Sequence, residues 1–176
     1  MERTGWERTW VRILTTVLTI AVMVLIFSFS MEDAERSDQT SGIISWQVIH
    51  MVYPDFDRQT PEEQYNCYET VQHLVRKTAH FTEYTILGLM MRFCLASWFG
   101  KKKGMLPAAW LAGTLYAGTD ELHQRLIDGR SAQWTDVMLD SCGVLTGALI
   151  ASLILALSWR EHGKKPERNV QSDGIL

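Results

Sequence analysis

The sequence lacks the cysteine spacings that would indicate a disulfide scaffold or a zinc site. Its three cysteines, Cys67, Cys94 and Cys142, are an odd number and stand in no paired metal-binding spacing. We therefore expect these cysteines to be small apolar residues that fill space in the core, apart from one thiol in a loop. The HExxH, CxxC, GxSxG and P-loop motifs are missing as well, which removes the common sequence signatures of several enzyme classes. With 17 Lys and Arg against 20 Asp and Glu and no basic stripe, the composition predicts no nucleic-acid partner.

Charged residues are scarce in four apolar blocks, which predict membrane spans at about 11–29, 79–99, 105–119 and 137–159. A helix needs about 20 apolar residues to cross a bilayer. The first block could instead belong to a cleaved signal peptide, but it exceeds the usual apolar region of about 7–15 residues, which favours a retained helix. The third block has only 15 residues, so a re-entrant element is its alternative.

The distribution of Lys and Arg predicts the orientation of these spans. With four spans and an internal N-terminus, ten basic residues fall in cytoplasmic segments and six in external ones. The ten are Arg3, Arg8, Arg12, Lys101, Lys102, Lys103, Arg160, Lys164, Lys165 and Arg168, and the six are Arg36, Arg58, Arg76, Lys77, Arg125 and Arg130. We therefore expect a cytoplasmic N-terminus over 1–10, a membrane domain over 11–158 and a cytoplasmic tail over 160–176.

The external segment at about 30–77 carries helix signals. Thr60-Pro61-Glu62-Glu63 combines an N-cap threonine, a proline at the first helical position and a glutamate that closes a capping box. A second helix is expected from Ser41 to Met51, where apolar residues recur near one side. We expect both helices to lie at the membrane interface or to cap the bundle. An ordered loop without membrane contact is the alternative.

Two further features of the spans have structural interpretations. Arg92 lies within snorkelling distance of the interface near Lys101, so we expect it to be an interface anchor. Gly143 and Gly147 form a GxxxG spacing, which allows another helix to approach closely. We interpret that motif as packing.

Three polar clusters stand at the ends of the apolar blocks. Because residues three and four apart share a helix face, they form three stripes: Lys77, His80, Glu83 and Tyr84; Tyr116, Asp120 and either His123 or Gln124; Asp136 and Asp140. In the predicted topology all three reach the outer leaflet. Four cations (Arg76, Lys77, Arg125 and Arg130) face six carboxylates (Glu83, Asp120, Glu121, Asp128, Asp136 and Asp140). Some carboxylates must therefore be solvated, share protons or bind an external cation.

The same residues carry a family resemblance. The series Lys77, His80-Phe81, Glu83-Tyr84, Asp120-Glu121, Gln124, Gly129-Arg130 and Asp136, followed by Gly143 and Gly147, resembles the signature of VanZ-like bacterial membrane proteins over about residues 10 to 158. The family usually has Asn where this chain has Asp140. The resemblance implies a multi-pass protein of the bacterial cytoplasmic membrane and a role in resistance to teicoplanin-type glycopeptide antibiotics or in maintenance of the cell envelope.

Three interpretations of the clusters compete. Lys77, His80, Glu83, Tyr84, Asp120, Glu121, Gln124, Arg130 and Asp136 could bind a polar lipid or glycopeptide head group, which we prefer. A membrane-embedded metal- or carboxylate-dependent hydrolase acting on an envelope lipid or precursor is the second interpretation. An ion-pair network that only holds helices in register is the third.

The sequence therefore predicts an all-α, polytopic membrane protein, a four-helix bundle with an external helical segment between spans one and two. Its expected partners are the bilayer and a polar envelope ligand. We expect no cofactor and no tightly bound transition metal, because the clusters offer mostly hard oxygen ligands and only two nearby histidines, His80 and His123. The absence of catalytic motifs makes an enzyme the less favoured hypothesis.

Overall fold

The chain is helical throughout the part that a computed structural model describes, residues 5–31, 34–100, 104–127 and 133–162. The helices are α1 (Gly5–Ser30), α2 (Ala34–Val52), the short 3₁₀ helix η1 (Phe56–Arg58), α3 (Pro61–Phe99), α4 (Met105–Gln124) and α5 (Trp134–His162). These ranges contain no strand. The all-α class predicted from the sequence is confirmed.

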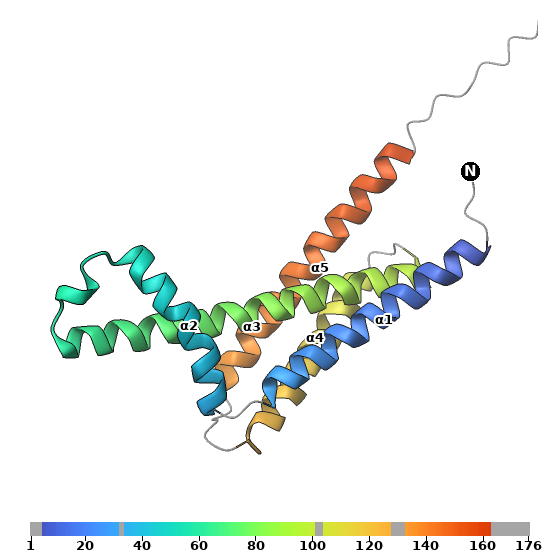
Figure 1. Cartoon of the computed structure of the whole chain (residues 1–176). Helices are drawn as coiled ribbons and strands as arrows, with labels where there is room; N and C mark the ends of the chain where they lie inside the picture. The colour runs from blue at the N-terminus through green and yellow to red at the C-terminus, as the bar shows by residue number, and fades with distance from the viewer. Residues whose placement is uncertain (1–4, 32–33, 101–103, 128–132, 163–176) are drawn as a thin grey trace, which may run out of the picture.

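Helix α3 is the central element of the fold and packs against α1, α2, α4 and α5 (Figure 1). Its C-terminal half lies in a bundle with α1, α4 and α5. Its N-terminal half extends away from that bundle, and α2 folds back along it with η1 at the turn (Figure 1). We call α2, η1 and the N-terminal half of α3 the arm.

The start of α3 confirms the capping box expected at Thr60. The Thr60 side chain accepts a hydrogen bond from the Glu63 backbone N–H, and the Glu63 carboxylate accepts one from the Thr60 backbone N–H at 2.9 Å. The helix then runs without interruption to Phe99, because after Pro61 it contains no further proline and a single glycine, Gly88. Its 39 residues make it about 58 Å long. The arm and the expected span at 79–99 therefore share one helix, which ends at Gly100 with φ of 80°.

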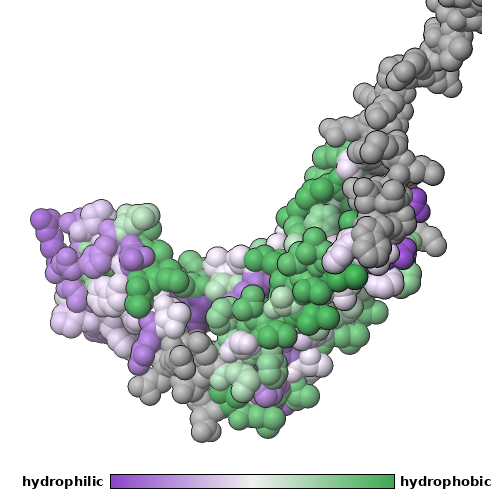
Figure 2. All heavy atoms as spheres, turned by 45° about the vertical axis from the view of Figure 1, so that its right-hand side comes forward, coloured by the Kyte–Doolittle hydropathy of each residue, from purple (hydrophilic) through white to green (hydrophobic). Residues whose placement is uncertain are grey.

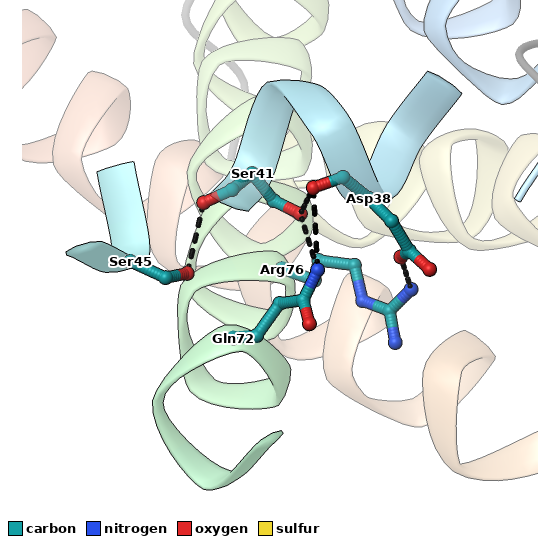
Figure 3. A network of polar contacts seen from close by, with 5 residues as sticks. All are labelled: Asp38, Ser41, Ser45, Gln72 and Arg76. Atoms are coloured by element: carbon teal, nitrogen blue, oxygen red, sulfur yellow. Dashed lines mark hydrogen bonds and ion pairs between the residues drawn. The ribbon is translucent and has the colours of Figure 1, made fainter. Parts of the chain in front are cut away.

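A small core holds the arm together, and α2 contains the helix predicted from Ser41 to Met51. Buried Ile49, Phe56 and Val71 form this core. Polar contacts flank it (Figure 3): the Gln72 amide donates to the Asp38 carbonyl oxygen at 3.3 Å, and Arg76 pairs with the Asp38 carboxylate at 2.7 Å. The arm therefore has its own packing, independent of the bundle.

Glycines bring α3 and α5 into close contact in the bundle. A Cβ atom added at Gly147 would collide with the Thr85 carbonyl oxygen, and one at Gly88 would collide with the Val144 carbonyl oxygen. The packing interpretation of the GxxxG spacing is confirmed. The adjoining core consists of Ile26, Tyr84, Leu87, Ala117 and Val144.

Two described helices are long and apolar enough to cross a membrane, over Arg8–Ser30 and Trp134–Ser158. Figure 2 shows apolar side chains gathered over the bundle and hydrophilic ones over much of the arm. In α1, side chains such as Leu14, Val17 and Val24 are more than half exposed. Helices of this composition favour a lipid environment, because large exposed apolar patches are rare on soluble monomers.

Two sequence expectations are wrong. Arg92 does not reach the interface: its side chain is buried, 4% exposed, and its Nε donates to the Ser152 hydroxyl of α5 at 2.9 Å. Its position on α3 directs it toward α5, where a hydroxyl supplies a partner. The expected loop thiol is also wrong, because the free cysteines Cys67, Cys94 and Cys142 all lie within helices.

Candidate functional site

The three polar clusters meet at one end of the bundle. Lys77, His80, Glu83 and Tyr84 lie in the middle of α3; Asp120, Glu121 and Gln124 lie in the last turns of α4; Asp136 and Asp140 lie in the first turns of α5. Each cluster thus comes from a different helix. The arm joins the bundle at this stretch of α3, because the N-terminal half of α3 belongs to the arm.

Asp120 is the residue on which the α3 and α4 clusters converge. Its side chain is buried, and its Oδ2 accepts a hydrogen bond from the Tyr84 hydroxyl at 3.2 Å. The Gln124 amide, one turn further along α4, donates to the same oxygen at 3.5 Å. Oδ1 has no hydrogen-bond partner among the described residues. One half of a buried carboxylate is therefore available as an acceptor.

Asp140 brings α5 into the same cluster. It is 2% exposed, and its Oδ1 also has no hydrogen-bond partner in the described ranges. Its carboxylate lies within electrostatic reach of Asp120, Glu121 and Glu83, and of the Lys77 ammonium. Buried polar atoms in folded proteins are nearly always satisfied, so two such oxygens on neighbouring carboxylates require an explanation.

Lys77 and Asp136 form an ion pair between α3 and α5 in which both side chains are about three-quarters buried. The Lys77 ammonium donates to Asp136 Oδ1. This pair uses Lys77, the cation of the α3 cluster. A second tie joins α4 to the start of α5, where Glu121 Oε1 accepts a hydrogen bond from the Gln133 backbone N–H at 2.6 Å.

The remaining predicted residues border this centre. Glu83 and His80 are half-buried on α3. The His123 ring lies against that of Phe27 in α1 in a tilted arrangement, with ring centroids 4.9 Å apart, and His123 is within electrostatic reach of Asp120. Arg130 lies outside the described residues, as do Asp128 and Gly129.

Residues beyond the predicted set also reach the centre. The buried hydroxyl of Ser30, at the end of α1, lies beside the Asp120 carboxylate without meeting hydrogen-bond geometry. No sequence pattern indicated it, because the contact joins distant parts of the chain. Asp140 was indicated by its spacing of one helical turn from Asp136, although it stood outside the predicted ligand-binding set.

The described side chains of the site offer many hydrogen-bond acceptors but are not arranged to coordinate a metal ion. In the described part of the chain, no group of three or more His, Cys, Asp or Glu side chains is arranged to hold a metal ion. The centre instead offers the half-satisfied carboxylate of Asp120, which the phenol of Tyr84 contacts, and the carboxylate of Asp140, which accepts no hydrogen bond from the described residues. Such a set can accept hydrogen bonds from a polar or cationic group.

Comparison with known proteins identifies the family. No curated protein and no solved structure matches the chain. The family model described as VanZ/LLP1 matches residues 15–155. This range covers most of the sequence and includes α2, α3, α4 and the larger part of α1 and α5. The chain therefore belongs to the VanZ/LLP1 family.

Proposed function

We propose that the bundle crosses the bacterial cytoplasmic membrane four times, through α1, the C-terminal half of α3, α4 and α5. Large apolar side chains on α3 and α4 support this, because Phe99, Leu111 and Leu115 are each more than half exposed. Such surfaces are favourable in lipid and costly in water. The arm then lies outside the cell and both termini lie in the cytoplasm, in agreement with the bias of Lys and Arg.

In this orientation the polar cluster opens at the outer face of the membrane, and its function is to recognise a polar ligand of the cell envelope. The main observation in support is that Asp120 and Asp140 are both buried, and that one carboxylate oxygen of each accepts no hydrogen bond from the described residues. Burying a carboxylate is costly unless it is paired. A ligand with N–H or O–H donors would supply the missing partners.

The biological role that fits this site is protection against glycopeptide antibiotics of the teicoplanin type, or maintenance of the envelope on which they act. Family membership supports the association, and these antibiotics act outside the membrane. The ligand would be an envelope lipid or glycopeptide head group that reaches Asp120 and Asp140 from the outer leaflet.

The test is to express Asp120→Asn and Asp140→Asn in a host that lacks its own homologue. Both variants should accumulate in the membrane near the wild-type level, because Asn retains one acceptor oxygen at each position, but should lose protection against teicoplanin. Asp55→Asn, an exposed change on the arm, is the matched control and should keep full protection. Protection by the double Asp120→Asn/Asp140→Asn variant equal to that of the wild type would refute the proposal.

A purely structural role is the second candidate, favoured by the ion pair between Lys77 and Asp136. Removing one member of a buried pair costs about 3–5 kcal/mol, since the other charge is left unpaired. Asp136→Asn should therefore lower the amount of folded protein. If Asp120→Asn and Asp140→Asn lower it equally, the whole cluster serves as a scaffold for the helices.

A further inference from the structure

A small pocket lies beside the polar cluster, where the end of α4 meets the start of α5. Its walls include Glu121 and Leu122 from α4, Arg125 directly after α4, Gln133 directly before α5, and Trp134 at the start of α5. Side chains of both charge signs therefore line one pocket, together with large apolar groups. This combination points to a ligand that carries both charges itself.

Glu121 supplies the negative wall of the pocket. Its side chain is 6% exposed, and Oε1 accepts the Gln133 backbone N–H at 2.6 Å. The second carboxylate oxygen receives no hydrogen bond from any described residue. A buried carboxylate that is already fixed in place and retains accepting capacity is suited to an ammonium group with N–H donors.

Arg125 supplies the positive wall, one helical turn after Glu121. Opposite charges four residues apart on a helix often pair, yet within the described ranges these two side chains form no ion pair with each other. Arg125 is exposed, and its guanidinium has no hydrogen-bond partner among the described residues. Its five donors suit the oxygens of a phosphate.

The apolar rim of the pocket indicates where the ligand comes from. Trp134 is 78% exposed and Leu122 is 62% exposed. Tryptophan is enriched at the level of lipid head groups, where its ring is half in the apolar layer. An exposed ring can also contact an ammonium group through its face. These neighbours favour a ligand attached to the membrane.

We propose that this pocket binds the zwitterionic phosphoethanolamine head group of a membrane lipid, with the ammonium at Glu121 and the phosphate at Arg125. The inference rests on the proposed function, because it names the ligand class of the recognition site that Asp120 and Asp140 adjoin. A quaternary choline head group has no N–H donor for Glu121. An anionic phosphoglycerol head group has no ammonium. Both should bind more weakly.

The experiment is native mass spectrometry of the full-length protein in detergent, with dioctanoyl lipids added at matched concentrations. The wild type should bind dioctanoylphosphatidylethanolamine at least about tenfold more tightly than the phosphatidylcholine or phosphatidylglycerol analogue, a difference of about 1.4 kcal/mol. Glu121→Gln should lower the affinity for phosphatidylethanolamine to that for phosphatidylglycerol. Arg125→Gln should lower the affinity for both of these lipids. Soluble glycerophosphoethanolamine should bind weakly if the lipid chains contribute. Equal binding of the soluble compound would reassign the source of the head group to a soluble molecule and overturn the lipid assignment.

Matched variants keep this test interpretable. Gln at position 121 retains an acceptor oxygen for the Gln133 N–H, and Arg125 is exposed, so Arg125→Gln should fold even if Glu121→Gln does not. Glu69→Gln and Arg58→Gln make the same charge changes on exposed positions of the arm and should leave the lipid preference unchanged.

The outcomes separate this inference from the proposed function. If the wild type binds all three lipids equally, or if Arg125→Gln leaves phosphatidylethanolamine binding unchanged, the head-group assignment is wrong. Loss of teicoplanin protection in Asp120→Asn would then still support recognition of another ligand. Conversely, a phosphatidylethanolamine preference that depends on Arg125, combined with unaltered protection in Asp120→Asn/Asp140→Asn, would support the pocket and refute the proposed function.

Discussion

The hydroxyl of Tyr84 in α3 donates a hydrogen bond to Asp120 in α4 across 3.2 Å, and both side chains are buried. This contact fixes α4 against the central helix at the level of the polar cluster. It also orients the Asp120 carboxylate, because the Tyr84 hydroxyl and the Gln124 amide both donate hydrogen bonds to the same oxygen, Oδ2. The opposite oxygen, Oδ1, has no hydrogen-bond partner among the described residues.

Tyr84→Phe should lower the free energy of unfolding by about 1–3 kcal/mol, because it leaves a buried carboxylate with one donor fewer. The measurement is unfolding of the purified protein in detergent, followed by circular dichroism. A double-mutant cycle with Asp120→Ala, which removes both acceptor oxygens, should give a non-zero coupling energy. Strict additivity of the two changes would show that the hydrogen bond contributes nothing to stability.

Gly147→Leu should destabilise the protein by more than the roughly 1–3 kcal/mol of ordinary overpacking. The new side chain would meet the Thr85 backbone rather than a side chain that can move. Thermal unfolding of the membrane fraction is the measurement. Gly118→Leu is the control, because a Cβ atom at Gly118 meets nothing within 4 Å, and it should unfold near the wild-type temperature. Equal losses at the two positions would contradict close packing of α3 on α5.

The first turn of α3 should respond to pH through Glu63. Hydrogen bonds from the Thr60 backbone and side chain lower the pKa of the Glu63 carboxyl below its ordinary value of 4.5. A carboxyl with a lowered folded pKa stabilises the helix start above its unfolded pKa, and this contribution is lost as the pH falls through the lowered value. Amide hydrogen exchange near Glu63 should therefore accelerate in that acidic range.

Glu63→Gln should remove this pH dependence, since Gln can accept the same Thr60 hydrogen bond without titrating. Glu62→Gln, in the same exposed turn, should retain it. If exchange in the wild type is insensitive to pH between 5 and about 3, after correction for intrinsic rates, the capping box does not depend on the ionised carboxylate.

The proposed topology predicts the location of reporter fusions. Fusions after Gly100 and at the C-terminus should be active in the cytoplasm, and a fusion near Arg58 should be active outside. The reason is the excess of basic residues at the ends of the predicted cytoplasmic segments. An external location for the Gly100 fusion would remove the outer-leaflet placement of Asp120 and Asp140.

The sequence by itself determined the helical class, the first turn of α3 and the chemistry of the polar cluster. These features depend on local patterns: apolar blocks of membrane length, the Thr60 to Glu63 capping box, and charges repeated at helical spacing. The close approach of Gly147 to α3 was also predictable, because glycines at GxxxG spacing in an apolar helix commonly let the backbone of a neighbouring helix approach closely.

Only the tertiary structure decided which polar groups meet. Both Arg92 and Lys77 were cations at helical positions, but Arg92 points inward to Ser152 while Lys77 pairs with Asp136. The orientation of α3 relative to α5 makes that choice, and no local pattern encodes it. The proximity of Asp140 to Asp120 has the same origin, since it requires two helices to pack with their acidic faces toward each other.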